Sequence, residues 1–259
     1  IQIGSNYKRD NFSLKLNTKP SKRTTLDFQV RYSDTDIRGG GANDATGAYD
    51  TDRRLKYALI YTPIPLKNLD SSAGSSDDDL GNLYNPVTSQ YDNDRKKERK
   101  QLNFSGSFGW EIFDNLKAKT EFGYDDYNEY DQRFFGLTTY QVRAAFADYP
   151  GKPGITLTDT KRHRFRNTNT ISYDFKKLIK NDKHAVNLLV GHEYVITKKH
   201  ENSADIRNFP TDFDAATAWK LSAQGTPNKV NDYYSADDKL LSFFTRANYN
   251  FEDKYLLSF

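Results

Sequence analysis

The 259-residue chain contains no cysteine and no methionine. Without cysteine it can have no disulfide framework, no thiolate metal site and no cysteine nucleophile. Long apolar runs are missing as well. The longest mostly apolar stretch, "YALIYTPIPL" (Tyr57–Leu66), contains two prolines and falls short of the roughly 18 residues of a membrane helix. The sequence therefore predicts no transmembrane helix.

No block of one charge sign stands out either. The 38 basic residues are interspersed with 35 acidic ones, whereas a nucleic-acid-binding surface needs clustered Lys and Arg. Nucleic acid is therefore not an expected partner. The first residues, "IQIGSNY", show neither the basic nor the apolar region of a signal peptide.

What the chain does have is aromatic residues, 18 Tyr and 17 Phe, which favour β-strands. In "TTLDFQVRYSD" and "QLNFSGSFGWEI" apolar and polar residues alternate strictly, which is the pattern of a strand with one apolar and one wet face. The same alternation predicts about eight strands, around residues 12–17, 24–34, 101–112, 116–125, 170–175, 185–196, 241–251 and 255–259.

The connections between these strands alternate between two lengths. Lys19–Arg23, Phe113–Asn115 and Glu252–Lys254 are tight turns, and Lys176–Lys183 is slightly longer. Long polar loops are expected at about 37–100, 136–159 and 201–237. Short turns on one rim and long loops on the other are typical of outer-membrane barrels, in which the loops are extracellular.

A soluble β-sandwich also alternates, and it remains an alternative. Sandwich strands average about 5–6 residues, whereas the alternation here often lasts for nine or more, as a tilted membrane strand of about 9–11 residues requires. Aromatic residues also lie near the strand ends, for example Trp110, Tyr173 and Tyr255. We therefore predict an all-β, antiparallel transmembrane β-barrel segment.

The stretch "FFTRANYNFEDKYLLSF" resembles the late barrel of the SusC/RagA family of TonB-dependent outer-membrane transporters. The family has an arginine-bearing strand, an Asn-Tyr pair, an acidic turn and a Lys-Tyr-Leu sequence in the order found here at Arg246, Asn248, Tyr249, Glu252, Asp253, Lys254, Tyr255 and Leu256. "TLDFQVRYSDTDIRGGG" and the region from "YNPVTSQYDND" to "KTEFGYD" resemble the same family.

The resemblance implies a plugged barrel of about 22 strands. We expect residues 1–259 to be a barrel segment from its middle to late part, without the plug domain. If the chain were complete, the alternative would be a closed eight-stranded barrel filled by its own side chains.

The resemblance also implies a function: active import of oligosaccharide, glycan or peptide nutrients across the outer membrane of a Gram-negative, Bacteroidetes-like bacterium. The implied partners are a SusD-like surface lipoprotein, the TonB complex and outer-membrane lipid. A passive porin-like channel and a soluble glycan-binding β-protein remain alternatives.

Aromatic residues of the predicted loops are the candidates for contact with a solute, because flat rings can stack on a sugar or pack against a peptide. With Arg246 of the wall, the candidates are Trp219, Tyr140, Tyr149, Tyr233 and Tyr234, together with Phe146, Phe209 and Phe213. Charged strand residues expected to face the lumen, where they could meet a plug or a solute, are Arg31, Glu111, Lys119, Glu121 and Arg166.

No motif predicts an enzyme, a cofactor or a metal site. The four histidines lack ligand spacing, and no nucleophile elbow, P-loop or dinucleotide-binding glycine pattern occurs. The acidic run Asp70–Asp79 lacks the spacing of a calcium loop. A short helix is expected between Asp50 and Pro63, where a capping residue precedes Leu55, Ala58 and Leu59 on one face.

Overall fold

The computed structural model describes residues 4–39, 86–139, 141–142, 148–179 and 183–259. Most of them belong to one antiparallel sheet of nine strands. The helix expected between Asp50 and Pro63 and the acidic run Asp70–Asp79 lie outside the described residues.

The elements follow one another along the chain with few helical segments between long strands. They are β1 (Asn6–Ser21), β2 (Thr24–Arg38), α3 (Pro86–Tyr91), β3 (Arg95–Phe113), β4 (Leu116–Phe135), β5 (Gly154–Asp174), α4 (Lys176–Ile179), β6 (His184–Arg207), α5 (Ala215–Lys220), η2 (Ser222–Gln224), β7 (Thr226–Tyr234), β8 (Asp238–Phe251) and β9 (Tyr255–Ser258).

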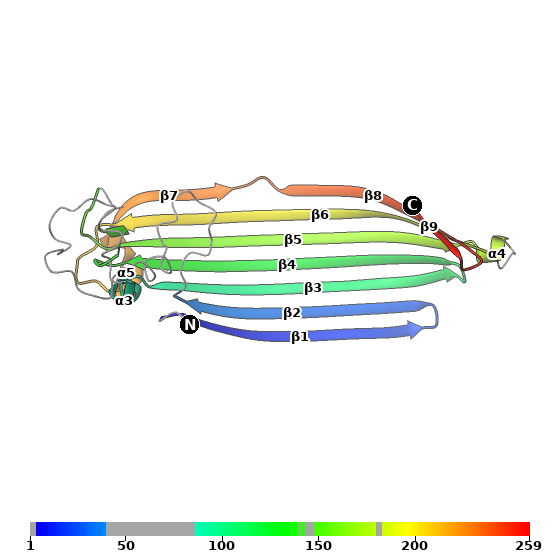
Figure 1. Cartoon of the computed structure of the whole chain (residues 1–259), viewed down its shortest axis with the longest axis horizontal. Coiled ribbons are helices and arrows are strands. Elements are labelled where there is room, and N and C mark those ends of the chain that lie inside the picture. The colour runs from blue at the N-terminus through cyan, green and yellow to red at the C-terminus, as the bar shows by residue number, and fades with distance from the viewer. Residues whose placement is uncertain (1–3, 40–85, 140, 143–147, 180–182) are drawn as a thin grey trace.

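The strands form an up-and-down sheet in the order β1-β2-β3-β4-β5-β6-β8-β9, and β7 extends the β8 side by pairing with the far end of β6. Figure 1 shows them side by side in a single layer, with α3 and α5 at one end and α4 with the tight turns at the other. Among the described residues β1 and β9 do not pair, so the sheet is open. The closed eight-stranded alternative is therefore not what the described part of the chain forms.

Register divides the sheet into two chemically different faces, because directly opposed residues of neighbouring strands point to the same side. One row across the sheet is Leu14, Val30, Phe104, Tyr124, Phe165 and Ile196. The adjacent row is Ser13, Arg31, Asn103, Asp125, Arg164 and Thr197. We name the sides that carry these rows the apolar face and the polar face.

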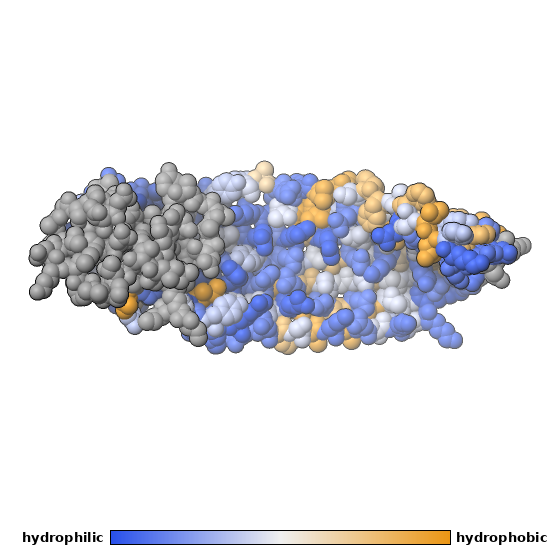
Figure 2. All heavy atoms as spheres, in the orientation of Figure 1, coloured by the Kyte–Doolittle hydropathy of each residue, from blue (hydrophilic) through white to orange (hydrophobic). Residues whose placement is uncertain are grey.

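The apolar face carries a band of exposed apolar side chains next to the tight turns. On the central strands β3, β4 and β5 the band covers Leu102–Trp110, Leu116–Tyr124 and Phe165–Tyr173, about nine residues each, which matches a tilted membrane strand. Phe243 is 78% exposed and Ile171 is 55% exposed. In Figure 2 apolar residues gather mainly in the half of the molecule toward the turns.

A histidine–carboxylate pair marks the end of this band away from the turns. His163 Nδ1 lies 2.8 Å from the Asp126 carboxylate, one step beyond Tyr124 and Phe165 on the same face. At the turn end, aromatic rings pack edge to face or tilted: Tyr173 against Phe175, with ring centroids 4.7 Å apart. The band is thus bounded on both sides.

One polar network interrupts the apolar band. The Asn169 amide donates to Asn167 Oδ1 over 2.6 Å and lies 3.2 Å from His192 Nε2. The Asn167 amide in turn contacts the Thr120 hydroxyl at 3.4 Å. Because these groups hydrogen-bond to one another, they avoid the cost of an unpaired polar group in an apolar setting.

The turn between β8 and β9 forms as the sequence predicts. Glu252 and Asp253 have φ values of 49° and 56°, and Lys254 N donates to Phe251 O over 3.0 Å, which defines a type I′ turn. Neither residue is the Asn or Gly that usually occupies such positions. The Asn250 side chain compensates by accepting from Asp253 N over 3.1 Å.

The strands run further than the sequence analysis predicted, so parts of the expected loops are sheet. β3 begins at Arg95 and β5 at Gly154, while β6 continues to Arg207. The segment Thr226–Tyr234 was expected to be part of a loop. It forms strand β7, which brings the number of strands from the predicted eight to nine. The extension Arg95–Lys100 of β3 is polar on both faces, which hides the period-2 signal on which the prediction relied.

A small core lies at the loop end, on the apolar face. Phe134, Ile155, Phe209 and Ala218 are buried there, with Trp219 and Phe213 packed against them. Asp214 caps α5 by accepting a 2.8 Å hydrogen bond from Thr217 N. Among the described residues no helix is long and apolar enough to cross a membrane.

Close packing at Gly106 yields a test of the register. A Cβ added to Gly106 would lie 2.5 Å from Phe122 Cζ, whereas one added to Gly123 would meet nothing closer than 3.9 Å. Gly106→Ala should therefore lower the free energy of unfolding of the full-length protein by about 1 kcal/mol, measured by denaturant titration in lipid vesicles. Gly123→Ala is the matched control and should be neutral or slightly stabilising. Equal effects of the two substitutions would contradict the register.

Candidate functional site

The charged wall residues predicted to face the lumen all lie on the polar face. Arg31 is opposite Asn103, Glu111 opposite Lys117 and Glu121 opposite Ser107. The remaining pairs are Lys119 with Thr170, Arg166 with Gly123, and Arg246 with Leu189. That this face lines a lumen stays a prediction.

The aromatic candidates are not brought together by the structure. Tyr233 is opposite Glu201 on the polar face, while Tyr234 is opposite His200 on the apolar face. The Lys199 ammonium lies 5.7 Å from the Tyr233 ring centroid, within the range of a cation–π contact. Tyr149 is half-buried, and Tyr140 and Phe146 lie outside the described residues.

Trp219, Phe209 and Phe213 all contribute to the small core at the loop end, and a role in solute contact stays a prediction. Phe209 is fully buried, so its ring cannot stack on a solute without rearrangement. The Trp219 indole Nε1 is buried and has no hydrogen-bond partner among the described residues. The indole ring packs against the buried residues of this core.

A ladder of ion pairs, which the sequence analysis missed, joins β3 to β4 on the polar face beyond the apolar band. Lys97 is opposite Asp131, and Arg99 is opposite Glu129. Lys97 Nζ lies 3.1 Å from Glu129 and 3.2 Å from Asp131. Arg95 contacts the same Asp131 through two nitrogens, at 2.9 and 2.5 Å. We name Arg95, Lys97, Arg99, Glu129 and Asp131 the charge ladder.

Tyr127 extends the charge ladder toward β5. Its hydroxyl donates to Glu129 Oε2 over 2.5 Å, and its ring lies between two guanidinium groups, 5.6 Å from Arg99 and 4.9 Å from Arg162. Burial raises the pKa of Tyr127 to about 12, and the hydrogen bond to Glu129 adds to this effect. Tyr127 therefore remains a neutral donor across physiological pH.

The carboxylates of the ladder stay ionised although they are half-buried. Burial by itself raises the pKa of Glu129, but hydrogen bonds from Tyr127, Arg99 and Lys97 outweigh it and hold the net pKa below the ordinary value. Asp131 behaves alike: burial raises its pKa, and the hydrogen bond and charge of Arg95 more than reverse the effect. Ionisation thus stabilises this part of the sheet.

The sequence signal for the charge ladder was present but incomplete. Basic residues alternate at 95, 97 and 99, and Glu129 and Asp131 share a face as well. A hairpin paired regularly from the turn at Asp114–Asn115 would place Lys97 opposite Gln132. A bulge between Glu111 and Phe113 shifts the register by one residue and places Lys97 opposite Asp131.

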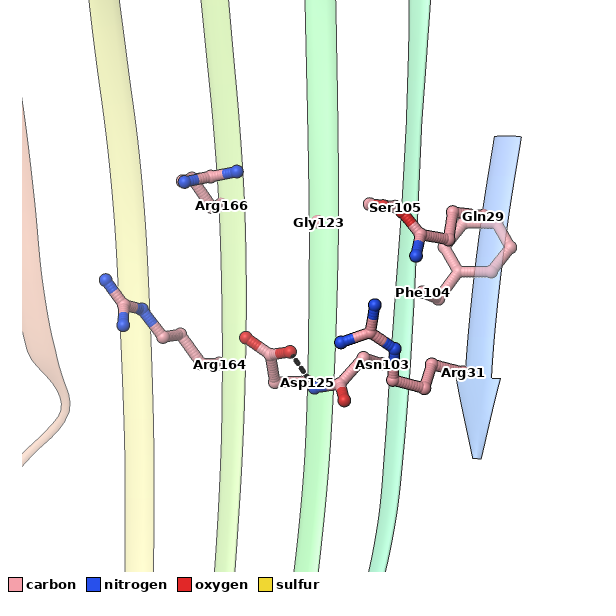
Figure 3. A pocket seen from close by; sticks show the side chains of 9 residues that line it. All are labelled: Gln29, Arg31, Asn103, Phe104, Ser105, Gly123, Asp125, Arg164 and Arg166. Atoms are coloured by element: carbon pink, nitrogen blue, oxygen red, sulfur yellow. Dashed lines mark hydrogen bonds between the residues drawn. The ribbon is translucent and has the colours of Figure 1, made fainter. Parts of the chain in front are cut away.

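A second group on the polar face consists of arginines rather than ion pairs. A cavity of about 330 Å³ opens on the polar face, at the same position along the strands as the apolar band. It is lined by Arg31 of β2, by Arg164 and Arg166 of β5, and by Gln29, Asn103, Phe104, Ser105, Gly123 and Asp125. In Figure 3 the guanidinium group of Arg31 reaches toward β4, Arg166 lies at β5, and the guanidinium group of Arg164 lies over β6. Only Asp125 contributes a carboxylate to this lining.

No metal site accompanies these groups in the part of the chain that the structure describes, where no three His, Asp or Glu side chains are placed to hold an ion. The polar face offers charge, hydrogen-bond donors and a few aromatic rings. Such a surface can hold or conduct a polar solute.

Loss of one ladder carboxylate should weaken the sheet in a pH-dependent way. We expect Glu129→Gln to lower the free energy of unfolding by about 1–3 kcal/mol at pH 7, because Arg99 and Lys97 lose a partner in a half-buried site. The pKa of Glu129 is depressed below 4.5, so its contribution is complete above that pH and is lost as pH falls through the folded-state value. The difference from wild type should therefore narrow below about pH 4.5.

The matched control is Asp159→Asn, which removes the exposed pair with Lys161 and should cost no more than about 0.5 kcal/mol. Denaturant titrations of the full-length protein at several pH values measure both variants. An effect of Glu129→Gln that is no larger than that of the control would contradict the role of the ladder.

Comparison with known proteins finds similarity to a TonB-dependent receptor and to a peptide transporter. No protein-family model matches the chain. A curated relative, TonB-dependent receptor P3 of Formosa agariphila, is 24% identical over 263 residues, covering 100% of this chain and 25% of the relative. The chain therefore spans about a quarter of the length of that relative.

Solved structures give the same answer for the fold. The RagAB peptide transporter matches with a TM-score of 0.70 at 16% identity, over 98% of this chain and 27% of that one. The RagAB peptide importer matches with TM-scores of 0.64 in its closed-closed state and 0.62 in its open-open state, at 17% and 18% identity. The shared feature is the long-stranded antiparallel sheet of a barrel wall.

These matches confirm two predictions made from the sequence. The fold is that of an antiparallel barrel segment, and the resemblance to the SusC/RagA family of TonB-dependent transporters is confirmed along the whole length of the chain.

Proposed function

We propose that this chain forms part of the barrel wall of a TonB-dependent importer in the outer membrane of a Gram-negative, Bacteroidetes-like bacterium. The observation that carries the proposal is the division of one continuous sheet into an exposed apolar band and a charged polar face. Every central strand maintains this division over about the thickness of a bilayer. In water such a band would be a large exposed apolar patch of the kind that soluble monomers avoid.

The cargo in this proposal is an oligosaccharide, glycan or peptide, and the polar face is the wall along which it passes. The names of the similar proteins favour active uptake, and those of the RagAB structures speak of peptides. The two-component name RagAB also supports a SusD-like lipoprotein as partner. We place the contact with TonB in the rest of the protein.

Two neighbouring phenylalanines of β8 provide the sharpest test of membrane insertion. Phe243 is opposite His192 on the apolar face and Phe244 is opposite Gly191 on the polar face, and their exposed fractions are 78% and 39%. The pair therefore differs in face but not in residue type or depth. The chain's lack of cysteine allows single spin labels at either position.

In the full-length protein reconstituted into lipid, a label at Phe243→Cys should be relaxed by lipid-dissolved oxygen, and a label at Phe244→Cys by a water-soluble quencher. Leu14→Cys and Lys15→Cys repeat the comparison on β1. Labels at Phe243 and Leu14 that meet only the aqueous quencher would show that the band faces water and would favour a soluble glycan-binding protein.

Electrical recording separates an importer from a passive channel. A barrel that is plugged until energised should show almost no ohmic conductance in a planar bilayer, and uptake of labelled peptide or glycan by cells should stop when TonB is deleted. Steady conductance together with TonB-independent uptake would favour a porin-like channel instead.

A further inference from the structure

Arg31, Arg164 and Arg166 form a group on the polar face that differs in kind from the charge ladder. Two adjacent rows of the sheet supply it. Arg31, Asn103, Asp125 and Arg164 are directly opposed in one row, and Gln29, Ser105, Gly123 and Arg166 in the next. Both rows cross the same four strands, so backbone pairing fixes where the side chains start. We name Arg31, Arg164 and Arg166 the arginine cluster.

Charge is unbalanced within this cluster. The residues that line the cavity include three arginines and one aspartate, which gives the lining a formal net charge of +2 (three minus one). The Asp125 carboxylate accepts a hydrogen bond from the Asn103 amide, drawn as the dashed line in Figure 3. Within the described residues no ion pair includes any of the three arginines.

The charge ladder supplies the contrast. There each cation lies within about 3 Å of a carboxylate, for example Arg99 Nη2 at 2.7 Å from Glu129. Both groups occupy the same face, but the ladder lies on β3 and β4, whereas the arginines of the cluster lie on the flanking strands β2 and β5. The three arginines of the cluster thus form no ion pair with a described carboxylate, although Asp27 and Glu121 line a neighbouring cavity together with Arg166.

Space for a ligand exists at the centre of the cluster because Gly123 has no side chain. An added Cβ there would have only Arg166 Nε and Phe104 O as neighbours, both at 3.9 Å. Gln29, Asn103 and Ser105 around it add neutral hydrogen-bonding groups. A planar guanidinium presents a fork of N–H donors that matches the two oxygens of a carboxylate.

We propose that the arginine cluster is a carboxylate-binding site on the inner wall, which takes the carboxylate of a passing solute such as a peptide C-terminus or an acidic sugar. The inference rests on the proposed function, because only an importer would bring a solute along this wall. It adds that the solute carries a carboxylate. The same chemistry could be satisfied by a carboxylate from another segment of the protein. The experiment below separates these two sources.

The test is binding, measured in detergent by calorimetry on the full-length protein, with acetyl-trialanine as the probe and its C-terminal amide as the control ligand. We expect the free acid to bind at least about tenfold more tightly than the amide, since hydrogen bonds to charged groups are the strong ones. Arg31→Gln, Arg164→Gln and Arg166→Gln should each remove most of that difference. Gly123→Leu, which fills the cavity and keeps every charge, should do the same.

Arg9→Gln is the matched control variant, because Arg9 lies on the same face, opposite Thr35, and is bonded to Asn11 at a distance from the cavity. It should leave binding of the acid unchanged. Substitution by Lys at Arg166 should give an intermediate loss, because an ammonium retains the charge without the fork.

A carboxylate supplied by the protein itself would give a different result. The probe would then fail to bind to wild type, and each Arg→Gln variant, but not Arg9→Gln, would lower the melting temperature without any ligand. That outcome supports the site and identifies its occupant as internal. If the acid and the amide bind alike, and no cluster variant changes binding or melting, the proposal is wrong. That failure would leave the spin-label and transport results intact, because the binding assay depends on neither.

Discussion

Backbone pairing between long antiparallel strands is the interaction on which the other features of this chain depend. Side chains alternate with a period of two along each strand, and the register carries that alternation unchanged from β1 to β8. A shift of one residue between any two strands would exchange their faces. The apolar band, the charge ladder and the arginine cluster all exist because the register is kept across the sheet.

The sheet is stabilised differently along its length. In the apolar band, rings pack across strands, as in the series Phe28, Phe104 and Phe122, whose centroids are 5.0 and 5.4 Å apart. Beyond the band, β3 and β4 are polar on both faces and are joined by the charge ladder and Tyr127. Closer to the loops, the small core around Phe209 and Ile155 takes over. The strands can therefore extend beyond the apolar band and stay hydrogen-bonded to their neighbours.

Two groups of charge on one face show how register decides electrostatics. In the charge ladder, acids and bases on adjacent strands face each other, and their mutual hydrogen bonds keep the carboxylates ionised. In the arginine cluster, Asp125 bonds to Asn103 instead, and the three arginines line one cavity together with Gly123. In the charge ladder every cation has a carboxylate partner. The arginine cluster is instead complementary to an anion.

Much of the fold could be read from the sequence, because an apolar–polar alternation such as Leu26–Tyr32 is a local property that survives in the structure. The tight turns at Asp114–Asn115 and Glu252–Lys254 were local as well. Where both faces are polar, as in residues 95–100 and 126–133, the alternation carries no hydrophobic signal, so β3 and β4 were predicted too short. The strand β7 was missed because its few apolar or aromatic residues, Val230, Tyr233 and Tyr234, do not follow a period of two.

The candidate site divides along the same line. By itself the sequence determined which residues share a face within a strand, and so it placed Arg31, Glu121 and Arg166 together on the polar side. Only the tertiary structure decided which of them are neighbours. That decision depends on pairing between residues far apart in the chain and on a single bulge between Glu111 and Phe113. An irregularity of one residue changes every partner beyond it, and no local pattern in the sequence fixes where it occurs.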